Sequence, residues 1–208
     1  MWYWHRTPLL IQALYPSLTW HKSRKEKSIY LTFDDGPISE MTPLVLDILS
    51  VHEVKATFFC VGDNVDKHPD IFQQVISAGH KVGNHTHNHL DGWKTSKHDY
   101  LGNVASCQQA IADKVTYQSI FRPPYGKASR SQLKQLMSTY EVVMWDVLSG
   151  DFDESLTPES CLQNTIKATQ NGSIVIFHDN VKAKVNLTYA LPKYIEHCLE
   201  NGYHFKTL

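Results

Sequence analysis

The sequence predicts one α/β domain, a distorted (β/α) barrel of about seven parallel strands. Its length of 208 residues fits a single domain with a sizeable core. Short runs of strand-forming residues alternate with helix-like segments, which is typical of a parallel sheet covered by helices. The runs are apolar, as expected for strands buried on both faces. An open doubly wound sheet is the second choice.

The individual elements follow from local patterns. The strand-like runs are rich in β-branched and aromatic residues. The segments between them carry apolar residues at helical spacing, such as Leu44 and Ile48, and Pro158 and Gly79 stand where a helix would begin and end. The predicted strands are 29–33, 56–61, 81–84, 120–122, 141–145, 173–177 and 203–207, and the predicted helices are 42–52, 69–78, 96–114, 129–139, 157–170 and 186–201.

Composition excludes several classes of protein. The formal net charge is -1, so neither nucleic acid nor an anionic membrane is expected as the main partner. The four cysteines are far apart and form no Cys-x-x-Cys pair, which argues against a thiolate zinc site or a dithiol redox site. We expect buried free cysteines, although spacing leaves disulfides open.

Residues 1–28 are interpreted as an N-terminal arm, and residues 29–208 as the main domain. The arm begins with aromatic and polar residues, and its apolar run Leu9-Leu10-Ile11 is short and lies between Pro8 and Pro16. This is a poor secretory signal, and no transmembrane segment is expected. Packing of the arm on the domain is favoured over contact with a membrane interface. The sequence leaves the compartment open, with a cytoplasmic or peripheral location as the default expectation.

Two neighbouring carboxylates, Asp34 and Asp35, follow the first predicted strand and precede Gly36-Pro37. The carboxyl ends of parallel strands are where α/β proteins build their sites. One carboxylate can bind a metal ion while the other accepts a proton. The alternative is a solvated turn, since Asp-Gly is common in turns.

Two histidines at the end of the third predicted strand suggest metal binding. His85 and His89 are four residues apart, so on a helical turn they would share one face. Zincins have this spacing with a Glu after the first His, where this chain has Thr86. A general base would then come from Asp34 or Asp35. Surface or core histidines are the alternative.

Later strand ends carry further polar groups. Arg122 precedes Pro123-Pro124, a rigid loop that can present a backbone N–H to a developing oxyanion. Arg122 can pair with a carboxylate, or be a surface residue in a rigid turn. His178 directly follows a buried strand and is placed either for proton transfer or as a hydrogen-bonded core histidine.

Five motifs occur in the order found in the polysaccharide deacetylases of carbohydrate esterase family four: Thr32–Pro37, His85-Thr86-x-x-His89, Arg122-Pro123-Pro124-Tyr125, Asp151 and Ile176-x-His178. From about residue 29 to the C-terminus, the chain resembles this family. The resemblance implies a distorted (β/α) barrel and metal-dependent removal of N-acetyl or O-acetyl groups from glycans such as chitin, peptidoglycan and xylan. Two positions depart from the family pattern, because Leu148 replaces an Asp and Phe152 replaces a Trp.

The resemblance also implies residue roles. The metal ligands would be Asp35, His85 and His89. The catalytic residues would be Asp34 as general base, Arg122 beside it, the Tyr125 N–H in the oxyanion hole, and His178 as general acid oriented by Asp151. The expected substrate contacts are Ile176 at the acetyl group, Phe152, Pro124 and Trp93. Trp93 is a candidate platform for a sugar ring, or else a packed surface tryptophan.

The leading hypothesis is hydrolysis of N-acetyl groups from an acetylated glycan, with release of acetate. Zn²⁺ is the expected metal, with Co²⁺, Ni²⁺ or Fe²⁺ as alternatives for two His and one carboxylate. An O-acetyl sugar esterase or a non-sugar amidohydrolase could use the same metal site. A catalytically idle sugar-binding module is the third hypothesis.

Overall fold

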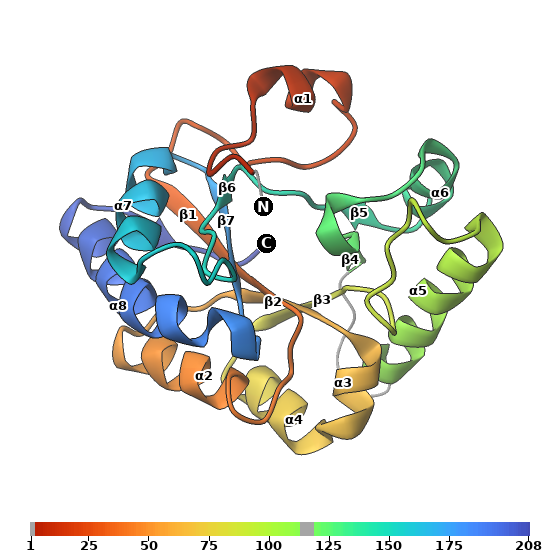
Figure 1. The fold of residues 1–208 in the computed structure, drawn as a ribbon, viewed down its shortest axis with the longest axis horizontal. Coiled ribbons are helices and arrows are strands. Elements are labelled where there is room, and N and C mark those ends of the chain that lie inside the picture. Colours follow the sequence, from red (N-terminus) through yellow and green to blue (C-terminus); the bar gives the residue numbers. More distant parts are fainter. Residues whose placement is uncertain (1–2, 113–118) are drawn as a thin grey trace.

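A computed structural model describes residues 3–112 and 119–208. Seven strands form one curved sheet in the order β5-β4-β3-β2-β1-β7-β6, and β8 pairs with the start of β1. Every ladder between these strands is parallel. Figure 1 shows the sheet curled into an open half-barrel with helices outside it, which confirms the predicted distorted barrel.

The strands are short and mostly buried, as their apolar sequences predicted. Their bounds are β1 Ser28–Asp34, β2 Thr57–Cys60, β3 Lys81–Asn84, β4 Ile120–Phe121, β5 Glu141–Val142, β6 Val147–Leu148, β7 Ile174–His178 and β8 His204–Phe205. The strand predicted for 141–145 is wrong at its end, because only residues 141–142 pair as β5. The separate strand β6 was not predicted.

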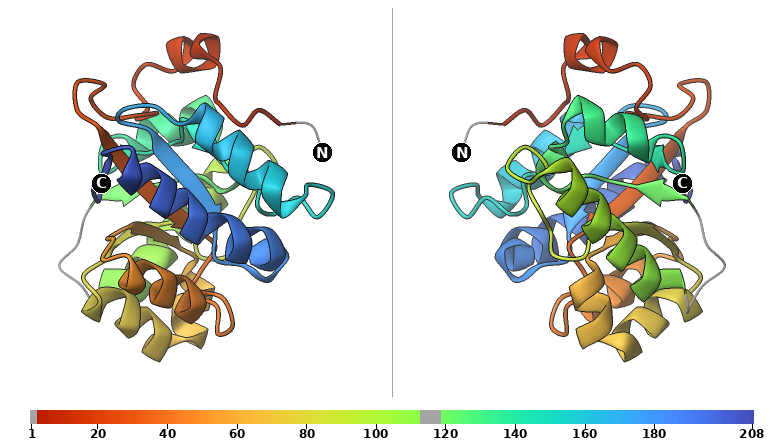
Figure 2. Two further views of the ribbon diagram at one scale, coloured as in Figure 1. Left: turned by 90° about the vertical axis from the view of Figure 1, so that its left-hand side faces the viewer. Right: turned by 90° about the vertical axis from the view of Figure 1, so that its right-hand side faces the viewer.

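The helices cover the outside of the sheet. Figure 2 shows α2, α7 and α8 on one side of the molecule and α5 and α6 on the other. The bounds are α1 Leu9–Leu14, α2 Thr42–Val51, α3 Gly62–Lys67, α4 Pro69–Ser77, α5 Lys97–Ala112, α6 Arg130–Leu136, α7 Pro158–Ala168 and α8 Lys184–Glu200, with 3-10 turns η1 Pro124–Gly126 and η2 Val181–Ala183. The six predicted helices are present, and α1 and α3 were not predicted. The last two residues of the predicted helix 96–114 and the first two residues of the arm, Met1 and Trp2, lie outside the described residues.

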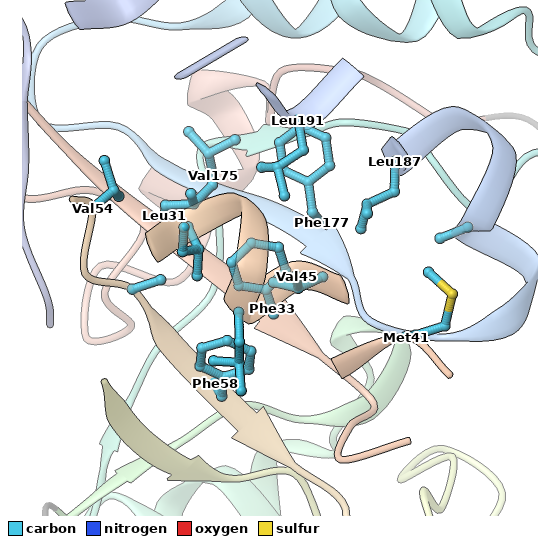
Figure 3. Close-up of a cluster of buried hydrophobic side chains, with 14 of the residues drawn as sticks. Leu31, Phe33, Met41, Val45, Val54, Phe58, Val175, Phe177, Leu187 and Leu191 are labelled. Atoms are coloured by element: carbon cyan, nitrogen blue, oxygen red, sulfur yellow. The ribbon is translucent and has the colours of Figure 1, made fainter. Parts of the chain in front are cut away.

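The main core lies between the central strands and the helices α2 and α8. Figure 3 shows Phe33 of β1 beside Phe58 of β2 and Phe177 of β7. The Phe33 and Phe58 rings stack with centroids 5.0 Å apart. Leu187 and Leu191 of α8 complete this layer and are fully buried. This packing fixes β1, which ends at Asp34, the first of the two neighbouring carboxylates.

The N-terminal arm pairs with both open edges of the sheet. Arg6 forms an antiparallel bridge with Val147 of β6, and Thr19 forms a parallel bridge with Val143 after β5. Trp20 is buried, and its indole N–H donates to the carbonyl oxygen of Tyr15. The arm therefore spans the side on which the half-barrel is open.

Two expectations from composition also have outcomes in the structure. All four cysteines are free and buried, as predicted. Within residues 3–112 and 119–208, no helix is long and apolar enough to cross a membrane.

Candidate active site and metal centre

The predicted site residues gather at the carboxyl ends of neighbouring strands. Asp34 ends β1, and in the β1–β7 ladder it is the direct partner of His178. His85 follows β3, and Arg122 follows β4. Because all strands of a parallel sheet have their carboxyl ends on the same side, residues that are far apart in the chain meet there.

Asp35, His85 and His89 converge as the sequence predicted. The Nε2 atom of His89 lies 3.0 Å from Asp35 Oδ1, and that of His85 lies 3.7 Å from the same oxygen. One ligand atom from each residue lies within 4.8 Å of the other two. Two imidazoles and one carboxylate, with room for another ligand, are typical of catalytic metal sites. These residues can therefore hold a metal ion.

The protonation of the three residues suits metal binding. His85 Nδ1 lies 2.8 Å from the carbonyl oxygen of Arg122, so Nδ1 carries the proton and Nε2 keeps a free lone pair. Burial lowers the pKa of His85 to about 4, so this imidazole is neutral at pH 7. Burial acts to raise the pKa of Asp35, but the hydrogen bond from His89 and the charge of His178 outweigh it and hold that pKa well below its usual range.

The segment between the two histidines is not helical, so the helical turn expected there is wrong. Thr86 and His89 have φ values of 63° and 54°, in the left-handed region. Side-chain oxygens replace the helical hydrogen bonds. Asn84 Oδ1 accepts from the N–H of Thr86 at 2.9 Å, and Asn103 Oδ1 of α5 accepts from the N–H of His87 at 2.8 Å. The loop still brings the two imidazole centroids to 5.1 Å.

Arg122 is fully buried, so the alternative of a surface arginine is wrong. Its guanidinium donates to Asp34 Oδ1 at 2.6 Å and to Thr32 Oγ1 at 2.8 Å. Its other donors reach the carbonyl oxygens of Val143 and Met144. With Oδ1 held in this way, Asp34 Oδ2 faces His85 Nε2 at 3.9 Å and remains available to accept a proton.

His178 and Asp151 form a tightly held pair. The Nδ1 atom of His178 lies 2.7 Å from Asp151 Oδ1, and the backbone N–H of His178 donates to Asp151 Oδ2 at 2.7 Å. Ser149 Oγ also donates to Asp151. Burial acts to lower the pKa of His178, but the charge and hydrogen bond of Asp151 outweigh it and raise the pKa to about 9. His178 is therefore protonated at neutral pH.

Tyr125 lies beside the metal triad in a left-handed conformation, with φ 60°. Its hydroxyl is 3.1 Å from His89 Nδ1, and the two rings meet edge to face at 4.6 Å. Lys127 connects this tyrosine to Trp93, because its Nζ lies 5.6 Å from the Tyr125 ring and 5.4 Å from the Trp93 ring. Trp93 is 68% exposed, which leaves it accessible to a ligand.

The other predicted substrate contacts differ in accessibility. Phe152 is partly buried, and its ring meets that of His178 edge to face at 5.1 Å. Ile176 and Pro124 are buried. A groove lies beside the loop that carries Asp151, lined by Glu154, Ser155, Leu156, Thr157, Pro158, Val181, Lys182, Val185 and Asn186.

Sequence reasoning missed three residues that hold the Asp34-Asp35 turn. The carboxylate of Asp179 accepts from the Gly36 N–H at 2.9 Å and from Thr42 Oγ1 at 2.6 Å, and burial raises its pKa to about 7. Asn64 donates to the carbonyl oxygen of Asp35 at 2.7 Å. Asn180 donates to Asp35 Oδ2 at 2.6 Å. The position of Asp179 and Asn180 directly after His178 was the available signal.

Comparisons with known proteins identify relatives of this chain. The model of the family described as Polysaccharide deacetylase matches residues 21–143. A peptidoglycan-N-acetylglucosamine deacetylase of Bacillus cereus is 32% identical over 204 residues, covering 96% of both chains. A chitooligosaccharide deacetylase of Rhizobium leguminosarum bv. trifolii is 34% identical over 158 residues, covering 74% of this chain and 72% of the relative.

A solved structure resembles the whole fold. It is the crystal structure of a peptidoglycan N-acetylglucosamine deacetylase in complex with 4-naphthalen-1-yl-N-oxidanyl-benzamide. It superposes with a TM-score of 0.89 at 30% sequence identity and covers 97% of this chain and 95% of its own. The similarity therefore includes the N-terminal arm as well as the sheet.

Proposed function

This chain belongs to the polysaccharide deacetylase family, and we propose that it hydrolyses the N-acetyl group of an N-acetylglucosamine residue in a glycan and releases acetate. One observation carries the proposal. An ion-paired carboxylate, a possible metal-binding triad and a protonated histidine meet at the carboxyl ends of neighbouring strands. Amide hydrolysis needs all three, because water must be deprotonated, the carbonyl polarised and a poor leaving group protonated.

Asp35, His85 and His89 would hold a divalent metal ion, with Zn²⁺ as our first choice and Co²⁺, Ni²⁺ or Fe²⁺ as alternatives. When bound, such an ion lowers the pKa of water and polarises the acetyl carbonyl. Asp34 takes the proton of the attacking water on Oδ2, while Arg122 holds Oδ1. The carboxylate thus keeps one fixed orientation during proton transfer.

The backbone N–H of Tyr125 donates to the developing oxyanion in this proposal. Losing one such donor typically costs about 3–4 kcal/mol of transition-state stabilisation. His178 protonates the leaving amine, and Asp151 holds the imidazole through Nδ1 so that Nε2 carries the transferable proton. Ile176 and Pro124 would border the acetyl methyl group, with Phe152 as the apolar wall next to His178.

The proposed substrate class is the N-acetylglucosamine of peptidoglycan, as in the Bacillus cereus relative, with chitooligosaccharides as the alternative. Trp93 would stack on a neighbouring sugar, and the groove between residues 154–158 and η2 would accept a further part of the glycan. Residues 29–208 would form the catalytic domain, with residues 1–28 as an arm attached to its sheet.

Acetate release tests the proposal. Zinc-loaded protein, a chelated sample and the Asp34→Asn variant are incubated with N-acetylglucosamine oligomers, peptidoglycan and acetylated xylan. We expect metal-dependent release from one of the first two substrates, and loss of turnover in Asp34→Asn with metal binding retained. Release from xylan alone would support an O-acetyl esterase. Binding without release by metal-loaded protein would support an idle sugar-binding module.

A further inference from the structure

The two oxygens of Asp35 have different surroundings. Oδ1 faces the Nε2 atoms of both His85 and His89, at 3.7 Å and 3.0 Å. Oδ2 accepts a hydrogen bond from the side-chain amide of Asn180 at 2.6 Å. One oxygen is therefore directed to the shared ligand position, and the other already has a donor.

The orientation of the Asn180 amide follows from its second contact. Its Oδ1 accepts from the backbone N–H of Ala183 at 3.0 Å, as the N-cap of η2. A backbone N–H can only donate, so the oxygen of the amide must face Ala183. The NH₂ group must then face Asp35, where it meets a carboxylate oxygen that can only accept.

The backbone around Asn180 is also tied to the turn that it contacts. Asp35 has φ 90°, an uncommon value for a residue with a side chain, which persists only where neighbours determine it. Asp179 accepts from the N–H of Gly36, and its own N–H donates to the carbonyl oxygen of Asp34 at 3.2 Å. The segment of residues 179–180 thus holds the turn through both backbone and side-chain bonds.

We propose that Asn180 is a positioning residue that restricts Asp35 to binding the metal through Oδ1 alone. A carboxylate that is free on both oxygens can rotate or bind a cation bidentately. A bidentate carboxylate would occupy a position that catalytic metal sites keep open for water and substrate. The proposal rests on the metal site of the proposed function and adds to it the residue that sets how Asp35 coordinates.

Two substitutions separate this role from the capping role of Asn180. Asn180→Ser keeps an N-cap side chain but lacks the amide that reaches Asp35, whereas Asn180→Ala loses both. Partners of metal ligands typically contribute about 10–100-fold in metal affinity. We therefore expect both variants to bind Zn²⁺ about 10–100-fold more weakly than the wild-type protein, while Asn180→Ala has the lower Tm of the two.

The matched control is Asn186→Ala. Asn186 is a buried asparagine of α8 whose amide donates to the carbonyl oxygens of Asp151 and Asp153 and does not contact the triad. Its loss is expected to lower Tm and leave Zn²⁺ affinity within about 3-fold, well below the effect of losing a partner of a ligand. The affinities are measured by competition with a chromophoric chelator, without substrate. The Co²⁺-substituted proteins add the visible spectrum, which should change in both Asn180 variants because it reports coordination geometry.

The outcomes distinguish this inference from the proposed function. If wild-type protein binds no Zn²⁺, the metal centre of the proposed function fails. If wild-type protein binds Zn²⁺, and both Asn180 variants bind it equally well with an unchanged Co²⁺ spectrum, the metal centre stands and the role of Asn180 is refuted. A fall in affinity that follows Tm, with Asn186→Ala also affected, would assign Asn180 a structural role only and refute the positioning role.

Discussion

Replacement of Asp151 by asparagine should convert His178 from a charged to a neutral residue at neutral pH. The pair is joined by a 2.7 Å contact between His178 Nδ1 and Asp151 Oδ1, and the pKa of His178 is raised to about 9. The asparagine side chain would keep a similar shape but remove the negative charge. Burial would then act to lower the pKa of His178 while the charges of Asp35 and Asp34 still act to raise it, and we expect it near the unperturbed value of about 6.5.

The magnitude follows from that change. A shift from about 9 to about 6.5 is roughly 2.5 units, or about 3 kcal/mol in favour of the charged form of His178. At pH 8 the protonated fraction would fall from roughly 90% to roughly 3%, an approximately 30-fold loss of the proposed general acid. Because the folded pKa is raised, this stabilisation is complete below about pH 6.5 and is lost as pH rises through about 9.

The assay is an NMR titration of the His178 ring in metal-free protein, with urea unfolding at pH 6 and pH 9.5 beside it. In the wild-type protein, the His178 ring should titrate near pH 9, and the free energy of unfolding should be lower at pH 9.5 than at pH 6. In Asp151→Asn, the ring should not titrate near pH 9, and the part of the pH dependence of stability that comes from this pair should be absent. Ser149→Ala is the control, because it removes a hydrogen bond to Asp151 but leaves the carboxylate. A pKa that stays near 9 in Asp151→Asn would refute the assignment of the shift to this ion pair.

Three further substitutions test separate parts of the structure. His85→Ala removes a ligand and should abolish stoichiometric Zn²⁺ binding, measured by equilibrium dialysis; full binding would exclude His85 from the site. Arg122→Met leaves the buried Asp34 carboxylate unpaired and should lower the unfolding free energy by about 3–5 kcal/mol in urea titration, whereas an unchanged value would contradict the buried ion pair. Trp20→Ala should cost roughly 3–5 kcal/mol, because Trp20 is buried in the arm; a change below about 1 kcal/mol would show that the arm contributes little to stability.

The motifs at strand ends were enough to predict which side chains meet, because a parallel sheet places the carboxyl ends of its strands on the same side. Val147–Leu148 was missed for a different reason. The sequence from Val142 to Trp145 is uniformly apolar and suggests one strand, but Arg122 takes the carbonyl oxygens of Val143 and Met144 for its own donors. The β4–β5 ladder ends at Val142, and the side chain of Arg122, from the segment after β4, hydrogen-bonds to the backbone beyond it, a contact that no local pattern reports.

The conformation of the loop from His85 to His89 also depends on a contact that the local sequence does not show. A spacing of four residues suggests a helical turn, yet Asn84 and Asn103 accept hydrogen bonds from the loop N–H groups and hold a left-handed conformation instead. Asn103 lies on α5, well beyond the motif in sequence. The ligand identities were therefore predictable from local sequence, but the loop conformation depends on a residue outside the motif.

The N-terminal arm connects the open edge of the sheet to the chemistry. β6 is the last strand in the sheet order, and an edge strand of two residues has little support of its own. The arm supports β6 through hydrogen bonds. The N–H of Leu148 donates to the carbonyl oxygen of His5 at 2.9 Å, and the His5 ring contacts the Leu148 carbonyl. Tyr3 packs on Phe152, whose ring contacts His178. Since Asp151 lies between Leu148 and Phe152, the arm supports both sides of the segment that sets the charge of His178.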